Sequence, residues 1–185
     1  MFNGVYEPSD DTRLLLEMVD LEKIKNTDVL DVCTGSGVVG IFIGLKAYPR
    51  KIIFIDIDYK ALMNVSYNLR LFPRIKSKAV LLQCDLLQCI KEKSIDVITA
   101  NPPYLPGEHG YIDVESGKKG YEIPCRIAFE ASRALRKNGV LYMVFSSLSM
   151  KEKVLECIDK AGFKVNRSIH KHLFFEDIIA IEAVK

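Results

Sequence analysis

The stretch Ile95-Asp96-Val97-Ile98-Thr99-Ala100-Asn101-Pro102-Pro103-Tyr104 joins an apolar run to a rigid, polar tetrapeptide. The run at 95–100 is typical of a buried strand. Pro102 and Pro103 fix two φ angles and favour an extended backbone in the residue before each of them. We therefore expect the Asn101 amide and the Pro102 carbonyl to be two immobile hydrogen-bond acceptors at the strand end, beside the Tyr104 ring. A proline-rich loop that closes a strand is the alternative.

Two acceptors that face one nitrogen suit a planar NH2 group. An amide or an exocyclic amine is a poor nucleophile because its lone pair is delocalised. Hydrogen bonds from both N–H groups to fixed acceptors favour the geometry in which the lone pair points at an electrophile. Asn101, Pro102 and Tyr104 are therefore candidate catalytic residues, and Pro103 belongs to the same substrate-binding wall. No general base is required, since the nitrogen becomes cationic and loses its proton to water.

The composition indicates one globular domain. The chain has 185 residues, of which 49% are hydrophobic and 27% charged, enough for a central sheet with helices on both faces. Lys and Arg number 26 against 24 Asp and Glu, so strong electrostatic binding of nucleic acid is not indicated. The five cysteines contain no C-x-x-C spacing and predict reduced thiols, with neither a disulfide framework nor a metal site.

The N-terminus is acidic, and the longest apolar stretch, 38–45, is too short to cross a bilayer. We therefore expect a soluble cytoplasmic protein.

Helical and strand patterns alternate along the chain, and this alternation predicts an α/β fold. We expect a doubly wound, seven-stranded, mostly parallel sheet with a C-terminal antiparallel hairpin. The predicted strands are 29–33, 51–57, 78–84, 95–100, 139–145, 163–169 and 174–184, and the predicted helices are 12–24, 37–48, 59–71, 121–136 and 150–161. The long irregular segment 105–120 is expected to be functional. Its His109 is expected to be solvated, and residues 170–172 to form a surface turn.

Asp31-Val32-Cys33-Thr34-Gly35-Ser36-Gly37 stands where the first strand turns into a helix. Small residues there let a ligand approach the helix N-terminus. Gly35-x-Gly37-x-x-Gly40 with Asp56 also fits the dinucleotide fingerprint of a dehydrogenase. Asp31 argues against a dehydrogenase, because its carboxylate would repel the pyrophosphate of a dinucleotide and attract an ammonium group. The chain also has no room for a separate dehydrogenase substrate domain.

Acidic side chains follow the first three predicted strands, at Asp31, Asp56 and Asp85. In a doubly wound sheet the carboxyl ends of neighbouring strands meet at one crevice, so we expect these residues to share a site with Asn101. S-adenosyl-L-methionine presents matching groups. We expect Asp31 at its ammonium, Asp56 at its ribose diol, Asp85 at its adenine amine, and Asn101 at its methyl. Helix capping or a solvated strand end is the alternative for each aspartate singly.

Four motifs in this order resemble a class I methyltransferase of the HemK type, with a Rossmann-like fold: 31–37, Phe54-Ile-Asp-Ile-Asp58, Cys84-Asp-Leu-Leu87 and 101–104. Val5-Tyr-Glu-Pro-Ser-Asp-Asp-Thr12 is similar to the Tyr-Glu-Pro-x-Glu-Asp-Thr signature of the short archaeal and eukaryotic branch. That branch methylates the glutamine of the Gly-Gly-Gln motif in class I peptide chain release factors. Residues 116–120 resemble its Gly-Gly-x-x-Gly substrate loop.

The resemblance implies S-adenosyl-L-methionine as cofactor and one methyltransferase domain over 1–185, with 1–26 covering the site and 105–120 as substrate loop. The implied cofactor contacts are Thr12, Asp31, Cys33, Gly35, Gly37, Asp56, Asp85, Leu86 and Asn101. Tyr6 and Glu7 are expected to close over the pocket, with a structural carboxylate as the alternative for Glu7. Cys33, Asp10 and Ser116 depart from the pattern, which leaves the loop conformation open.

A partner is also implied. The third strand is expected at the sheet edge, and Ala79-Val80-Leu81-Leu82 makes it apolar, with Lys76 and Lys78 nearby. The short branch works with a small zinc-binding activator protein that adds a strand at this edge. Packing of these side chains against helices of the same domain is the alternative.

Two other functions remain open. An adenine amino-methyltransferase acting on DNA or RNA uses the same tetrapeptide on a flipped base, but the chain shows no basic groove for it. A non-catalytic binding subunit would be expected to lose the tetrapeptide or the aspartates, and both are present.

Overall fold

A seven-stranded sheet forms the centre of the computed structural model, which describes residues 4–107 and 114–185. Its order is β3-β2-β1-β4-β5-β7-β6, so β3 is an edge strand, as predicted. Strands β1 to β5 run parallel, and β7 runs antiparallel to both β5 and β6. The strands are β1 Asp28–Val32, β2 Lys51–Asp56, β3 Ala79–Gln83, β4 Ile95–Ala100, β5 Leu135–Ser146, β6 Lys164–His172 and β7 Asp177–Val184. The predicted fold class is confirmed.

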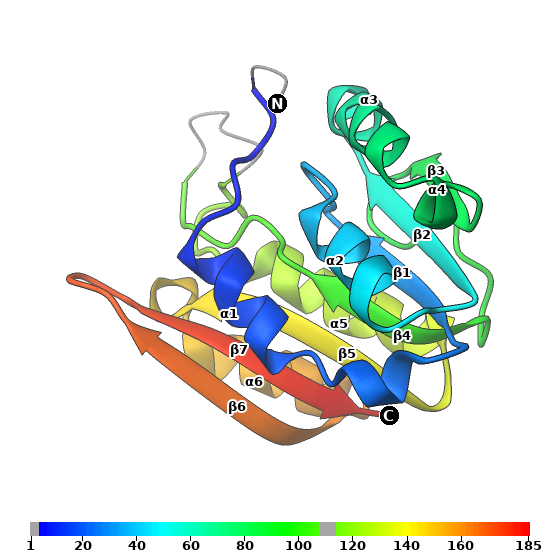
Figure 1. The fold of residues 1–185 in the computed structure, drawn as a ribbon. Coiled ribbons are helices and arrows are strands. Elements are labelled where there is room, and N and C mark those ends of the chain that lie inside the picture. The colour runs from blue at the N-terminus through cyan, green and yellow to red at the C-terminus, as the bar shows by residue number, and fades with distance from the viewer. Residues whose placement is uncertain (1–3, 108–113) are drawn as a thin grey trace.

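Helices cover both faces of the sheet (Figure 1). One face carries α1 Asp10–Met18, α2 Val38–Lys46, α3 Tyr59–Asn68 and α4 Pro73–Lys76; the other carries α5 Glu122–Ala134 and α6 Lys151–Lys160. Alternate residues of β5 serve the two faces. Tyr142 packs with α1 and α2, whereas Leu141 packs with α5 and α6, which explains the continuous apolar run of this strand. None of the described helices is long and apolar enough to cross a membrane.

Two local predictions were wrong. Residues 170–172 are the last residues of β6 and pair with β7, so the turn lies at 173–176 instead. The extended ladder, together with a hydrogen bond of 2.7 Å between His172 Nδ1 and Asp177 Oδ1, outweighs the polar character of the segment. The helix predicted over 12–24 ends at Met18 and continues only as a 3-10 turn, Leu21–Ile24, which the Asp20 side chain caps.

The prediction of reduced cysteines was also wrong. Disulfides join Cys84 to Cys89 and Cys125 to Cys157, and Cys33 is free. Cys125 lies on α5 and Cys157 on α6, 32 residues apart in sequence but neighbours in the packed helix pair. Sequence spacing alone carried no sign of this pairing.

Candidate active site

A cleft of about 1040 Å³ lies at the carboxyl ends of β1 to β4. Parallel α/β sheets bind ligands at this end, because loops from neighbouring strands diverge there. The predicted site residues that line the cleft are Cys33, Gly35, Asp56, Asp85, Leu86, Asn101, Pro102, Pro103 and Tyr104. Thr12, Asp31 and Gly37 are buried and do not line it. The structure therefore brings most of the predicted site together at one cleft, and the cofactor contacts of the other three residues stay predictions.

Asn101 is oriented by a neighbour from α1. Its Nδ2 donates a hydrogen bond of 3.1 Å to Thr12 Oγ1. The amide oxygen accepts no hydrogen bond from any residue that the structure describes, so it remains an acceptor in the cleft. Thr12 is buried, and it reaches the site through Asn101. The predicted contact between Thr12 and the cofactor stays a prediction.

Asp11, next to Thr12 on α1, is a buried carboxylate at the edge of the cleft, with 3% of its surface exposed. Its Oδ2 accepts hydrogen bonds from the hydroxyls of Tyr6, at 2.7 Å, and Tyr104, at 2.9 Å. Its Oδ1 accepts from the backbone N–H and the hydroxyl of Thr12. Burial and the adjacent Asp11 charge raise the pKa of Tyr104 far above its ordinary value, so this phenol stays protonated as a donor. Sequence reasoning assigned no role to Asp11, although Asp11 matches the aspartate of the Tyr-Glu-Pro-x-Glu-Asp-Thr signature.

Asp31 holds the loop between β1 and α2 together. Its Oδ1 accepts from Thr99 Oγ1 at 2.8 Å, and its Oδ2 accepts from Thr34 Oγ1 at 2.6 Å and the Gly40 N–H at 3.1 Å. Burial raises the pKa of Asp31 to about 6, against the opposing effect of these hydrogen bonds. With 2% exposure it does not reach the cleft surface. The predicted contact with an ammonium group stays a prediction.

Asp56 lies at the end of β2 and faces the cleft. Its Oδ2 accepts from the Gly35 N–H at 2.9 Å, and its Oδ1 accepts from the Asp58 N–H at 3.0 Å. Burial raises its pKa above the ordinary range. Each oxygen keeps a further lone pair, so the carboxylate can accept from two hydroxyl groups of a ligand. The geometry suits the diol that the sequence assigned to it.

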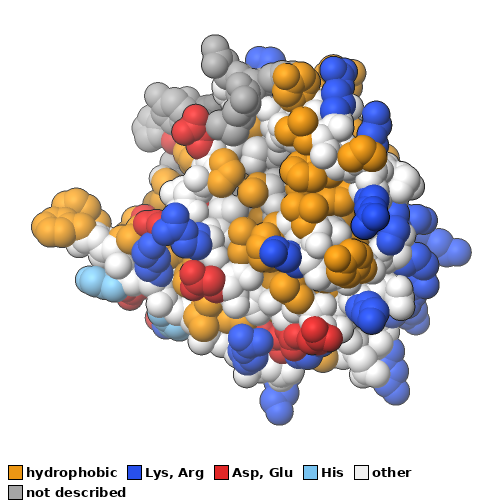
Figure 2. All heavy atoms as spheres, in the orientation of Figure 1, with side chains coloured by type: hydrophobic (Ala, Val, Ile, Leu, Met, Phe, Trp, Pro, Cys, Tyr) orange, Lys and Arg blue, Asp and Glu red, His pale blue; other side chains and the backbone are white. Residues whose placement is uncertain are grey.

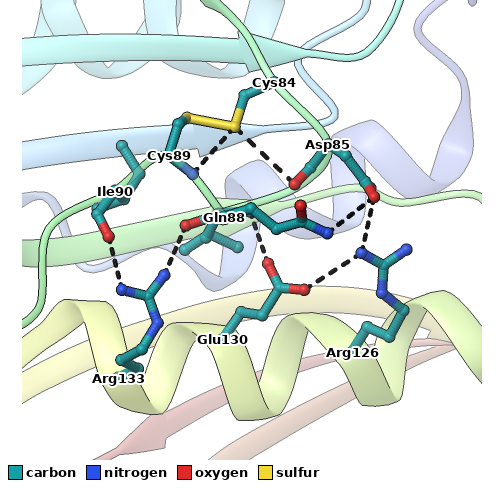
Figure 3. Close-up of a disulfide and its surroundings, with 9 residues drawn as sticks. Cys84, Asp85, Gln88, Cys89, Ile90, Arg126, Glu130 and Arg133 are labelled. Atoms are coloured by element: carbon teal, nitrogen blue, oxygen red, sulfur yellow. Dashed lines mark hydrogen bonds and ion pairs between the residues drawn. A yellow bond between two sulfur atoms is a disulfide. The ribbon is translucent and has the colours of Figure 1, made fainter.

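Asp85 follows β3 and belongs to a surface network (Figure 3). Its Oδ2 accepts from Arg126 Nη2 at 2.9 Å and from Gln88 Nε2 at 3.0 Å. Arg126, on α5, also contacts Glu130 at 3.3 Å and lines the cleft. The Asp85 carboxylate raises the pKa of this guanidinium. Arg126 was missed by the sequence analysis, since it stands 41 residues away without any motif.

Two non-glycine residues of the cleft have left-handed backbone, Cys33 with φ 54° and Leu86 with φ 49°. Such conformations are strained and concentrate at functional sites. The positive φ explains why glycine would suit position 33, where cysteine departs from the resembling family. Gly37, with φ 81°, begins α2, and a Cβ there would lie 2.8 Å from Val65 Cγ2. Gly37 therefore permits close packing of α2 on α3.

The described part of the 105–120 segment closes over Tyr104. Ser116 is buried, and its Oγ accepts from the Ile123 N–H at 2.8 Å near the start of α5. A Cβ at Gly120 would lie 2.5 Å from the Tyr104 carbonyl oxygen, which also accepts from Ser149 Oγ at 2.6 Å. Ser116 therefore supports the segment from inside. His109 lies outside the described residues.

Comparisons with known proteins agree with this geometry. The family model described as methyltransferase small domain matches residues 6–168. A chain of Methanocaldococcus jannaschii provisionally named a protein N5-glutamine methyltransferase is 34% identical, with 97% of this chain and 91% of that one covered. The release factor glutamine methyltransferase of Borreliella burgdorferi is 28% identical, with 88% and 60% covered. Mtq2 in the E. cuniculi Mtq2–Trm112 complex matches with a TM-score of 0.78 and 24% identity, with 98% and 99% covered. The family match covers most of the chain, which therefore belongs to the methyltransferase small domain family.

Proposed function

We propose that the chain methylates the side-chain amide nitrogen of the glutamine in the Gly-Gly-Gln motif of a class I peptide chain release factor. The observation that carries the proposal is the Asn101 amide, whose nitrogen is bound to Thr12 while its oxygen is left as an acceptor in the cleft. The relatives named above support a release-factor glutamine as the group that receives the methyl. The enzyme of B. burgdorferi is a release factor glutamine methyltransferase, and the E. cuniculi complex methylates the termination factor eRF1.

The cleft fits S-adenosyl-L-methionine, which supplies an electrophilic methyl group on a sulfonium centre. Asp56 would hold the ribose diol, and its oxygens are oriented for this by the Gly35 and Asp58 N–H groups. Asp85 and the backbone of Leu86 would hold the adenine. The small side chains of Cys33 and Gly35 leave room beside them. Asp31 would attract the ammonium group of the cofactor electrostatically, although its buried carboxylate does not line the cleft.

The acceptor nitrogen is oriented by this chain's own oxygens. Asn101 Oδ1 accepts one N–H of the glutamine amide, and the Pro102 carbonyl accepts the other. This arrangement turns the lone pair toward the methyl group and stabilises the cationic nitrogen that forms. Tyr104 stays protonated and packs against the flat amide. The surplus proton leaves to water, so no side chain acts as a base.

The shape of the cleft favours glycines beside the glutamine. Tyr104 lines the cleft together with Leu105, Val114 and Glu115. Side chains on residues next to the glutamine would obstruct entry past these residues. Glycine avoids the clash and permits the unusual backbone that insertion needs.

We further propose a small zinc-binding activator protein at the β3 edge. Val80 and Leu81 are 41% and 36% exposed, although β3 is apolar. Figure 2 shows Lys and Arg side chains around hydrophobic ones on the side of α3 and α4. The E. cuniculi complex pairs Mtq2 with Trm112. An added strand would bury this edge by main-chain pairing. Leu81→Lys should abolish co-purification with the activator, whereas full recovery would contradict this interface; Leu71→Lys, at an exposed site on the short turn after α3, is the control.

We propose that the chain acts as one methyltransferase domain, with 1–26 covering the site and 105–120 facing the substrate. We place it in the cytoplasm because release factors work there. Disulfides such as the two found here are more typical of oxidising compartments. The proposed cytoplasmic location therefore follows only from where the proposed substrate works.

The experiment is methyl transfer from labelled cofactor to a release factor, with the modified residue located by mass spectrometry. The expected result is a single methyl on the glutamine of Gly-Gly-Gln, in the presence of the activator. The control substrate carries asparagine in place of that glutamine. Methylation of adenine in DNA or RNA, with no methylated glutamine, would replace the proposal by the nucleic-acid alternative.

A further inference from the structure

The geometry points to Asp11 as a positioning residue that sets which way the Asn101 amide faces. The inference rests on the proposed function for its acceptor. Asp11 and Asn101 are not hydrogen-bonded to each other. Thr12 lies between them, and its single hydroxyl is hydrogen-bonded to both. The Thr12 hydroxyl lies 3.2 Å from Asp11 Oδ1 and 3.1 Å from Asn101 Nδ2.

The direction of this chain of hydrogen bonds follows from its acidic end. A carboxylate only accepts hydrogen bonds, so the Thr12 hydroxyl must donate to Asp11. A hydroxyl has one proton, and the Thr12 oxygen can then only accept from Asn101. The NH2 group of Asn101 is therefore turned toward α1, and its oxygen toward the cleft. With a neutral partner at position 11, either orientation of the amide would satisfy Thr12.

Asp11 is occupied by donors from this chain and is not free to bind a ligand. Its two oxygens accept hydrogen bonds from the Tyr6 and Tyr104 hydroxyls and twice from Thr12. These hydrogen bonds use both carboxylate oxygens on groups of this chain. It acts through the groups that it orients.

The same carboxylate joins the N-terminal segment to the acceptor wall. Tyr6 precedes α1, and a Cβ at Gly35 would lie 3.7 Å from Tyr6 Cβ, so Tyr6 lies beside the loop that begins α2. Tyr104 follows β4 and also lines the cleft. By accepting from both hydroxyls at one oxygen, Asp11 fixes the spacing between the two tyrosine side chains.

The test uses Asp11→Asn and a pair at position 12, Thr12→Val and Thr12→Ser. Asp11→Asn keeps the size of the side chain but introduces donors, which should lower kcat about 10- to 100-fold, with cofactor Kd changed less than about threefold. Thr12→Val should lower kcat similarly, and Thr12→Ser should restore much of the loss because it keeps the hydroxyl. In the Thr12→Val background Asp11→Asn should cost less than it does in the wild-type background, because the path through Thr12 is already broken and only the hydrogen bonds from Tyr6 and Tyr104 remain to be disturbed.

Asp10→Asn is the matched control. Asp10 is the neighbouring aspartate, half-exposed and paired with Lys171 at 2.6 Å, and its variant should keep wild-type kcat. The packing of the tyrosines can also be measured without an acceptor substrate, by circular dichroism, because the chain has eight Tyr and no Trp. Near-ultraviolet circular dichroism should change in Asp11→Asn and Tyr104→Phe but not in Asp10→Asn.

Wild-type kcat in Asp11→Asn, or multiplicative losses in the double variant, would overturn the inference. So would a loss confined to cofactor affinity, which would make Asp11 a direct ligand. If the wild type methylates a different acceptor, the proposed function fails, and the same variants measured on that acceptor and by dichroism still decide the inference.

Discussion

Replacement of Asn101 by alanine tests the acceptor geometry most directly. The variant removes the amide oxygen in the cleft and leaves the Pro102 carbonyl, so one of the two acceptors that we propose for the glutamine NH2 group is lost. It also leaves Thr12 Oγ1 without the hydrogen bond from Nδ2. The first effect acts on the reacting nitrogen, and the second acts on folding stability.

The two effects differ in size. Loss of one preorganised polar contact to a transition state costs roughly 10²- to 10³-fold in rate. Loss of one hydrogen bond to a hydroxyl costs about 1 kcal/mol of unfolding free energy. We therefore expect kcat to fall at least about 10²-fold, while the melting temperature drops by a few degrees only. Cofactor Kd should change less than about threefold, because Asp56 and Asp85 are untouched.

The assay is single-turnover transfer of labelled methyl to a release factor, with calorimetry for cofactor affinity. Asn101→Asp is the informative companion, since it keeps an acceptor oxygen in the cleft but replaces the donor to Thr12 Oγ1 by a second acceptor. It should bind the cofactor and transfer more slowly than wild type but faster than Asn101→Ala. An alanine variant within about fivefold of wild-type kcat would refute the two-acceptor geometry.

Three further outcomes are expected. Asp56→Ala should weaken cofactor binding by about 2 kcal/mol in calorimetry, since two charge-assisted hydrogen bonds are lost; unchanged affinity would contradict its assignment. Because the pKa of Asp31 is raised to about 6, the folded protein binds a proton between about pH 6 and pH 4 that the unfolded chain does not. Binding of this proton stabilises the folded state at low pH, and the stabilisation is lost as pH rises through 6. Relative to Asp31→Asn, unfolding free energy should gain up to about 3 kcal/mol over this fall in pH, and parallel curves would exclude it. Cys125→Ser should lower the free energy of unfolding by about 3 to 4 kcal/mol, because it removes a disulfide between residues 32 positions apart. Urea unfolding measures this loss, and Cys157→Ser should show the same loss.

The sequence by itself determined the strand that leads into Asn101 and the alternation that builds the parallel sheet, whereas the position of β3 at its edge was expected from the family resemblance. The strand and the alternation depend on local periodicity and on residues with strong backbone preferences, such as Pro102 and Pro103. Neighbours in sequence decide them, so they can be read without coordinates. The aspartate at the end of β2 was predicted for the same reason, because strand ends on one edge must converge.

Tertiary structure alone decided the environment of each carboxylate. Asp11 and Asp31 are both buried aspartates near the site, yet one orients Thr12 and two tyrosines while the other holds Thr34, Gly40 and Thr99. Their partners come from segments up to 93 residues away, a separation that no local pattern encodes. The same holds for the two disulfides and for the bond between Arg126 and Asp85. Direction and burial of a side chain depend on packing between distant segments, and this decides whether an acidic residue is a ligand or a support.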